Sequence, residues 1–272
     1  MTQIPPVRPE TALLHQAHWP AGAFDAVQPG VFRASTVFFP DAASWRRRDW
    51  LAKDAFVYGP QGTPTTFELE ARIAQLEGAE HALLCPSGLN ALALVYLAFL
   101  KPGDEVLVPA NVCFAHRRLL AGPLAAWGIR AVTFDPLQPA AIPFSPATAM
   151  LWLEAPLSLT MEFPDVPAVV AAARAAGVPV ALDDTWSAGM AYSPFDLGAD
   201  LTVQSLGKYA NGAADVVMGS VCTRDETLYA ALKLRALALG LNVSPADAAD
   251  VLRGTQTLGL RYAAQDLSLI HI

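Results

Sequence analysis

Lys208 and Asp183 are the two residues of this sequence whose types and spacing point most directly to chemistry. Lys208 lies in the segment 205–209, which precedes a stretch rich in glycine and alanine, and Asp183 follows the apolar run 178–182. A lysine can bond to pyridoxal phosphate as a Schiff base, and an acid can keep the pyridine nitrogen protonated so that the ring accepts electrons. The pair alone proves little, since a surface lysine and a turn aspartate would give the same pattern.

A phosphate group needs backbone amides and hydroxyls at the start of a helix, and one segment provides them. Ser87, Gly88 and Leu89 follow the expected strand 81–85 and open an apolar helix. A helix N-terminus presents free amides and the positive end of its dipole to an anion. Ser205 adds a hydroxyl after another expected strand. Ser87 is also simply a good helix cap, so this signal is weak by itself.

The segments around these residues alternate between strand and helix patterns. Short apolar runs without polar alternation indicate strands that are buried on both faces. The expected strands are 81–85, 105–109, 129–134, 150–154, 178–182, 201–204 and 216–222, and the expected helices are 65–77, 88–100, 114–127, 166–176 and 225–239. This alternation predicts an α/β fold with a mostly parallel sheet and helices on both faces. Ligands of such sheets bind beyond the carboxyl ends of the strands.

Local signals mark the ends of several expected helices. Thr65 and Glu68 have the spacing of a capping box, with Glu68 able to reach the Thr65 amide. Asp165 is expected to begin the helix 166–176. Gly78 and Gly128 stand where the helices before them should end.

Five ordered segments together resemble the cystathionine β-lyase branch of the cysteine/methionine-metabolism pyridoxal phosphate enzymes. They read YGPQGTPTT (58–66), EAPLSLTME (154–162), DDTWSAG (183–189), SLGKY (205–209) and RGTQTLGLR (253–261). The resemblance implies the large domain of the aspartate aminotransferase-like fold. It also implies that Lys208 carries the cofactor and moves protons, and that Asp183 pairs with the ring nitrogen.

Other site residues follow from the same resemblance. It implies that Ser87, Gly88, Leu89 and Ser205 bind the phosphate. Ser158 matches the position that contacts the ring hydroxyl, and Cys113 the position of a tyrosine that stacks on the ring. Tyr58 matches a tyrosine that reaches the phosphate of the neighbouring subunit.

The sequence departs from the family pattern at four positions. Pro60 replaces an arginine, which removes one charge-assisted phosphate contact. Cys113 cannot stack on a ring, although Phe114 could if the register shifts by one. Gly207 stands where a phosphate-binding threonine is usual, and Asp184 where asparagine is usual. These departures concern cofactor affinity and specificity rather than the fold.

We expect four regions along the chain. Residues 1–55 read as an irregular, proline-containing arm, 56–240 as the cofactor-binding large domain, and 241–266 as the start of a connection. Residues 267–272 fit nothing before them and are interpreted as a non-native tail, or alternatively as a hydrophobic C-terminal tail. Relatives continue into a small C-terminal domain that supplies the arginine for the substrate carboxylate, so we expect that domain to be missing here.

The resemblance implies an enzyme that eliminates a thiol from Cβ of an amino-acid thioether. Cystathionine would give homocysteine, pyruvate and ammonia in methionine biosynthesis. Ser158 favours this branch, because γ-acting relatives usually carry asparagine there. A γ-eliminating or γ-replacing enzyme stays open, and so does a non-catalytic cofactor-binding fragment. A homotetramer, built as a dimer of dimers with shared active sites, is also implied.

Composition argues against several other classes of protein. The 272 residues are 53% apolar, which is enough for a sizeable core, and the net charge of −7 argues against nucleic acid as the main partner. The three cysteines, Cys85, Cys113 and Cys222, have neither disulfide nor metal spacing and fit a reducing cytoplasm. The longest apolar run, 91–100, is too short to cross a bilayer.

Overall fold

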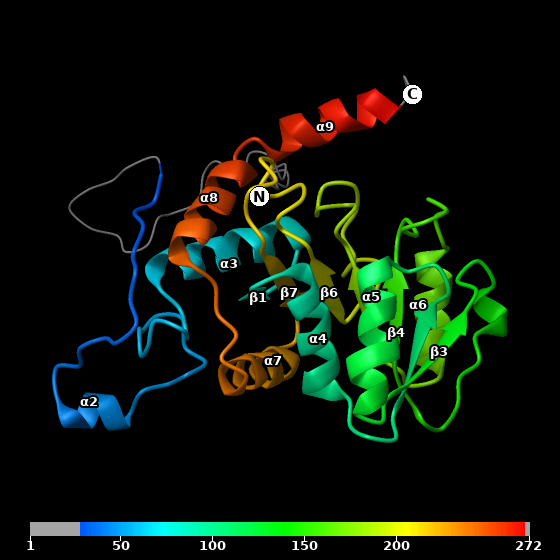
Figure 1. Ribbon diagram of the computed structural model, residues 1–272, viewed down its shortest axis with the longest axis horizontal. Helices are drawn as coiled ribbons and strands as arrows, with labels where there is room; N and C mark the ends of the chain where they lie inside the picture. The colour runs from blue at the N-terminus through cyan, green and yellow to red at the C-terminus, as the bar shows by residue number, and fades with distance from the viewer. Residues whose placement is uncertain (1–27, 270–272) are drawn as a thin grey trace, which may run out of the picture.

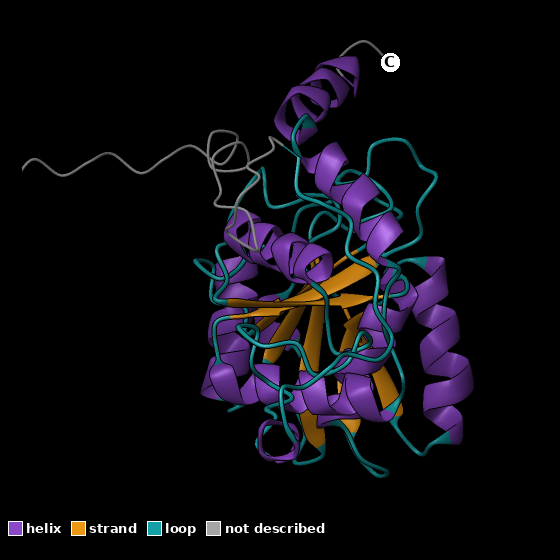
Figure 2. Cartoon of the chain, turned by 90° about the vertical axis from the view of Figure 1, so that its left-hand side faces the viewer, coloured by secondary structure: helices purple, strands orange, loops and turns teal. Residues whose placement is uncertain are grey.

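A seven-stranded sheet forms the centre of the computed structural model, which describes residues 28–269 (Figures 1 and 2). Its strands are β1 (His81–Cys85), β2 (Glu105–Pro109), β3 (Arg130–Phe134), β4 (Thr148–Glu154), β5 (Val180–Asp183), β6 (Leu201–Gln204) and β7 (Gly219–Thr223), in the order β1-β7-β6-β5-β4-β2-β3. Strands β3, β2, β4, β5 and β6 pair in parallel, whereas β7 runs antiparallel to both of its neighbours, β1 and β6. The predicted mostly parallel sheet is confirmed.

Helices cover both faces of this sheet. The α-helices of the described residues are α2 (Ala42–Arg46), α3 (Pro64–Glu77), α4 (Gly88–Phe99), α5 (Phe114–Leu119), α6 (Val166–Ala175), α7 (Glu226–Ala238), α8 (Pro245–Thr255) and α9 (Leu258–Leu269). One face packs against α4, α5 and α7, and the other against α3, α6 and α8. Because successive strand residues point to opposite faces, Val106 and Val108 of β2 join the first core while Leu107 joins the second. Apart from the edge strand β3, most of whose residues are exposed, the strands are therefore buried on both sides, as their apolar runs predict.

The expected capping box at Thr65 and Glu68 is wrong. Helix α3 begins two residues earlier, with Thr63 as its N-cap and Thr66 completing the box. Pro64 explains the shift, because proline fits the first helical position, where its missing N–H is not needed. Glu68 instead pairs with Arg72 one turn later, at 2.9 Å and buried. The two expected helix ends hold, since Gly78 and Gly128 both have positive φ.

Other boundaries also differ from expectation. The expected helix 114–127 is interrupted by a π-helical turn, Leu120–Leu124, which contains Pro123. Proline cannot donate its amide to the preceding turn, so the regular hydrogen-bond ladder breaks there. Strand β7 begins at Gly219 rather than 216, because its pairing with β1 starts opposite Cys85.

The described part of the expected arm, residues 28–55, contains the short helix α2 and otherwise lacks regular elements. It is tied to the main body by hydrogen bonds, including one from the amide of Phe32 to Thr65 Oγ1 (2.8 Å) and one from the amide of Gly59 to the carbonyl oxygen of Ser35 (2.7 Å). Residues 1–27 of the arm and 270–272 of the expected tail lie outside the described residues.

The segment after residue 240 forms two helices. Helix α8 buries Ala248, Val251 and Leu252 in the core that α3 also lines, and α9 extends away from the sheet (Figure 1). The division at residue 240 stays a prediction. None of the helices between residues 28 and 269 is both long and apolar enough to cross a membrane.

Candidate active site

The carboxyl ends of the central strands bring the predicted site residues to one edge of the sheet. Glu154 ends β4 and Asp183 ends β5, and the two are paired in register. Neighbouring strands lie about 4.8 Å apart, so these two carboxyl groups are direct neighbours. Asp183 is also paired with Val203 of β6, and the chain that leaves β6 carries Ser205 and Lys208. The parallel sheet therefore places two acids and one lysine together.

Asp183 is held by the turn that follows it. The amide of Thr185 donates a hydrogen bond to Asp183 Oδ1 at 3.1 Å. Burial raises the pKa of Asp183, while the hydrogen bonds from Thr185 and the nearby Lys208 lower it. A desolvated carboxyl of this kind favours the anion only when a cationic partner is present. Asp183 can therefore pair with a protonated ring nitrogen.

Glu154 is a second carboxyl of the site, and its position ties two elements together. Its side chain accepts hydrogen bonds from the Ser158 hydroxyl and, at 3.1 Å, from the amide of Cys113. Burial and the neighbouring Asp183 raise the pKa of Glu154 to about 7. Glu154 fixes the start of α5 and the loop after β4, both of which border Asp183.

The expected phosphate-binding residues also converge. Ser87 caps α4, since its hydroxyl accepts the amide of Asn90 at 3.0 Å and donates to Asn90 Oδ1 at 2.8 Å. This capping leaves the first amides of α4, at Gly88 and Leu89, as the donors available to an anion. A Cβ at Gly88 would lie 2.9 Å from the Cβ of Ser205, so the helix start and the Ser205 loop pack directly together.

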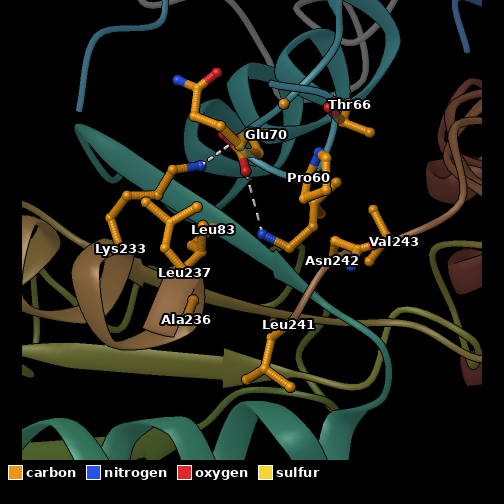
Figure 3. A pocket seen from close by; sticks show the side chains of 14 residues that line it. Pro60, Thr66, Glu70, Leu83, Lys233, Ala236, Leu237, Leu241, Asn242 and Val243 are labelled. Atoms are coloured by element: carbon orange, nitrogen blue, oxygen red, sulfur yellow. Dashed lines mark hydrogen bonds between the residues drawn. The ribbon is translucent and has the colours of Figure 1, made fainter. Parts of the chain in front are cut away.

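Lys208 lines a cavity of about 540 Å³, together with Thr185, Trp186, Tyr209, Gly212, Ala214 and Gln265. Its side chain is exposed. The other three lysines of the chain are placed elsewhere. Lys53 pairs with Glu70 at 2.7 Å. The buried Lys233, labelled in Figure 3, donates to the carbonyl oxygen of Gln61. Lys101 follows α4, at the end of the helix opposite to its N-terminus.

Three remaining site predictions have different placements. Cys113 precedes α5. Burial and the nearby acids Asp183 and Glu154 raise the pKa of its thiol, whereas Lys208 lowers it. Ser158 directs its hydroxyl to Glu154. Tyr58 is exposed and does not line the cavity that Lys208 borders in the described structure. The roles of these residues, and of the others in the site, stay predictions.

The structure gives a physical reason for the unusual glycine at position 207. A Cβ there would lie 2.3 Å from the carbonyl oxygen of Val216, which is backbone and cannot swing away. A threonine side chain therefore has no room at this position. The segment 216–218 approaches the backbone of Gly207 so closely that a side chain at this position would collide with it.

Replacing Gly207 by threonine is expected to lower the free energy of unfolding by about 1–3 kcal/mol, as overpacking does elsewhere. The chain would have to move away from Val216, which would shift Lys208 next to it. Urea unfolding of the cofactor-free chain measures this. Gly122→Thr is the matched control, since nothing lies within 4 Å of a Cβ at Gly122. Equal losses in the two variants would contradict the steric explanation.

Asp184, the other departure next to Asp183, points away into a buried acidic pair. Asp184 Oδ2 accepts the amide of Gly189 at 3.1 Å, while Oδ1 is buried without a hydrogen-bond partner. Glu77 is buried as well and accepts hydrogen bonds from Thr202 and Gln204. Burial raises the pKa of Asp184 to about 7, and burial and Asp184 raise that of Glu77. No cation pairs with either acid in the described part of the chain, so burial favours the protonated form of both carboxyl groups.

Asp184→Asn is expected to stabilise the fold more as the pH rises. The pKa of Asp184 is raised in the folded state, so its stabilising contribution is present below about pH 4 and is lost as the pH rises towards 7. Asparagine does not titrate. The stability difference between variant and parent should therefore grow by up to about 3 kcal/mol from pH 5 to pH 8. Denaturation at both pH values tests this, with the exposed Asp250→Asn as control; the same pH dependence in both would rule the explanation out.

The residues at this edge fit pyridoxal phosphate on three observations. An exposed lysine amine faces a cavity, a partly buried carboxyl would gain from a cationic ring nitrogen, and a helix N-terminus packs against a serine loop. Lys208 would bond to the cofactor, Asp183 would meet its ring nitrogen, and the start of α4 with Ser205 would face its phosphate. Among the described residues, no group of three or more His, Cys, Asp or Glu side chains could hold a metal ion.

Sequence reasoning missed two acids of this region. Glu154 lies in one of the segments that resemble the family, and it ends a parallel strand just as Asp183 does. That position was the signal that could have identified it. Glu77 carried no such signal, because it sits in the last turn of α3 and meets β6 only in the folded chain.

Comparison with known proteins places these features in context. The family model described as "Cys/Met metabolism PLP-dependent enzyme" matches residues 10–272. The chain is 35% identical to the cystathionine β-lyase of Bordetella avium and 34% identical to the cystathionine β-lyase MetC of Escherichia coli. Both alignments cover 93% of this chain but only 66% and 65% of those proteins, which is less than two thirds of either.

A solved structure has the same architecture. The cystathionine γ-lyase of Lactobacillus plantarum, complexed with L-serine, superposes with a TM-score of 0.86 at 26% identity. The match covers 93% of this chain and 65% of that one. The similarity therefore extends over the sheet, its helices and the edge where Asp183 and Lys208 lie.

Proposed function

The chain belongs to the Cys/Met metabolism family of pyridoxal phosphate-dependent enzymes, and from this we propose that its protein is a carbon–sulfur β-lyase that cleaves L-cystathionine. The reaction consumes water and gives homocysteine, pyruvate and ammonia. The observation that carries the proposal is the placement of Lys208 and Asp183 on one edge of the sheet, in a chain about 35% identical to proteins named cystathionine β-lyase.

Each site residue has a defined task in this proposal. The bound cofactor supplies an electron sink that acidifies Cα of the amino acid. The amine of Lys208, exposed in the cavity, takes the proton from Cα and can return it to the leaving thiol. Asp183 keeps the ring nitrogen protonated through a charge-assisted hydrogen bond in a poorly solvated site. Glu154 orients Ser158 and the start of α5 around the ring.

The proposal also specifies which carbon–sulfur bond is broken, the one at Cβ or the one at Cγ of the amino acid. Ser158 and the segment 158–162 support β-elimination, because they match the β-lyase branch of the family. A γ-acting enzyme is the second candidate, supported by the structural likeness to a cystathionine γ-lyase. A γ-acting enzyme must also remove a proton from Cβ. The one lysine that borders the cavity would then have to take part in two proton abstractions instead of one.

The keto acid product separates these candidates. We expect any keto acid that the purified chain, loaded with pyridoxal phosphate, releases from L-cystathionine to be pyruvate, in an amount equal to that of homocysteine. Release of 2-oxobutyrate would identify γ-elimination instead. Tight cofactor binding without any keto acid would favour the third reading, a cofactor-binding fragment of a longer enzyme.

We propose further that the protein is a homo-oligomer, a tetramer of two dimers, in which Tyr58 completes the site of a neighbouring subunit. The exposure of the Tyr58 side chain supports this, because it leaves the ring accessible to a neighbouring subunit. The free cysteines and the biosynthetic reaction support a cytoplasmic enzyme of methionine biosynthesis.

Shared sites predict complementation between inactive chains. Mixing Lys208→Ala with Tyr58→Phe should restore up to about a quarter of the parent activity, because one site of each mixed dimer then carries both parent residues. Activity of separately purified and remixed chains measures this, and two Lys208→Ala preparations serve as the control. No recovery in mixed oligomers verified by mass would contradict a shared site.

A further inference from the structure

We propose that Arg261 and Tyr262, in the first turns of α9, are positioning residues that hold the Lys208 loop and the Asp183 loop at one fixed separation. Both loops must contact a single rigid ring, one through an amine and the other through a carboxyl. The inference requires only that the chain binds pyridoxal phosphate. It does not depend on which carbon–sulfur bond the enzyme breaks.

Arg261 is bound almost entirely to backbone oxygens of the lysine loop and its surroundings. Its guanidinium donates to the carbonyl oxygens of Tyr209 (2.6 Å) and Ala210 (3.3 Å), the first two residues after Lys208. It also donates to the carbonyl oxygen of Gly254 (2.6 Å) and to Thr257 Oγ1 (3.1 Å). One side chain thus joins the lysine loop to the junction between α8 and α9.

The bonding of Arg261 is unusual because no carboxylate pairs with it among the described residues. A guanidinium presents five N–H donors in a rigid planar fork. Here that fork meets carbonyl oxygens, and the neutral contacts fix position without adding a counter-charge near the site. The side chain therefore acts as a brace for the backbone rather than as a member of an ion pair.

Two glycines show how tightly the brace fits. A Cβ at Gly212, which has a φ of +80°, would lie 2.4 Å from the central carbon of the Arg261 guanidinium. A Cβ at Gly254 would lie 2.2 Å from the carbonyl oxygen of Asn211. The loop after Lys208 is thus packed between Arg261 on one side and α8 on the other.

Tyr262 connects the same helix to the acid loop. Its hydroxyl donates to the carbonyl oxygen of Trp186 at 3.1 Å, three residues after Asp183. Its ring lies 5.5 Å from that of Tyr209, and the Tyr209 ring lies 6.5 Å from that of Trp186. Adjacent residues of α9 therefore contact the two loops, and Tyr209, next to Lys208, lies between them.

The consequence is that α9 sets the spacing between the lysine amine and the acid. Functional groups must be held within about half an ångström of their productive positions by a supporting shell. Removing the brace would leave Lys208 and Asp183 in place on average but would let their separation vary. Cofactor affinity and the environment of the bound ring should change, while the strands keep their fold.

The experiment compares Arg261→Gln, Arg261→Lys and Tyr262→Phe in the full 272-residue chain. Arg253→Gln is the matched control, since Arg253 is exposed on the adjacent helix and lies 3.7 Å from Asp250. Pyridoxal phosphate is titrated into each cofactor-free protein, and its dissociation constant is read from the visible absorbance. Circular dichroism of the same band reports the asymmetry around the ring. Urea unfolding without cofactor reports the stability of the fold.

We expect Arg261→Gln to weaken cofactor binding by at least about tenfold and Tyr262→Phe by about threefold, as losses of charged and neutral hydrogen bonds do. Both should reduce the circular dichroism of the bound cofactor. Arg261→Lys should bind as weakly as Arg261→Gln, because an ammonium cannot span four acceptors. Arg253→Gln should bind like the parent.

Two results would overturn the proposal. The first is parent-like affinity and circular dichroism in both Tyr262→Phe and folded Arg261→Gln, even if their unfolding midpoints fall, because the residues would then serve the fold alone. The second is full recovery of affinity in Arg261→Lys, because positive charge rather than the four-way contact would then matter. Tyr262→Phe retains the ring, so it provides a test even if Arg261→Gln fails to fold.

Discussion

Lys208→Ala is expected to lose keto acid release by at least about a thousandfold, within the range that a catalytic proton-transfer group contributes. The amine of Lys208 is the one lysine nitrogen that borders the cavity at the carboxyl ends of β5 and β6. Its loss should also remove the visible absorbance of covalently held cofactor. Single-turnover and steady-state rates with L-cystathionine measure the effect on chemistry.

Lys101→Ala provides the control for Lys208→Ala, because Lys101 lies after the C-terminal end of α4. It should keep both the absorbance and the rate of the parent. Retention of more than about a tenth of the parent rate in Lys208→Ala would contradict a proton-transfer role, since such groups contribute at least about a hundredfold.

Asp183→Asn is expected to lower kcat by about a hundredfold or more while leaving the cofactor bound through Lys208. Asparagine keeps the shape of the side chain but cannot carry the negative charge that holds a proton on a ring nitrogen. The loss should appear in kcat more than in KM, because the missing interaction stabilises charge that develops during the reaction.

Asp184→Asn is the matched control for Asp183→Asn, since it makes the same chemical change one residue away on a side chain that points into the buried pair with Glu77. It should retain most of the parent kcat. If the two variants lost activity equally, the assignment of the ring-nitrogen partner to Asp183 rather than Asp184 would be wrong.

Much of the sheet could be predicted because its strands are short, apolar and separated by marked helices. Strands β1, β2 and β6 begin and end where their residue patterns indicate. The order of the strands could not be read from the sequence, since it depends on which helices pack on which face. The start of α3 was misplaced because two overlapping capping patterns compete, and Pro64 favours the earlier one.

The site could be predicted from the sequence only at residues whose side chains carry reactive groups. Lys208 and Asp183 follow buried strands and carry groups that such positions rarely need for folding. Gly207 and Asp184 differ from the family pattern, and their neighbours are known only from the folded chain. The carbonyl oxygen of Val216 lies against Gly207, and the buried Glu77 lies near Asp184. Arg261 braces the lysine loop from 53 residues away in the sequence, a contact that no local pattern indicates.

Borohydride reduction shows directly whether Lys208 is the residue that holds the cofactor. The chain is loaded with pyridoxal phosphate, reduced, digested and mapped by mass spectrometry. All four lysines lie in the described residues, and three are remote from the cavity or engaged elsewhere. One labelled peptide, which contains Lys208, is expected, and no label is expected in Lys208→Ala. A stoichiometric label on Lys233, Lys53 or Lys101 would contradict the assignment of the cofactor to Lys208.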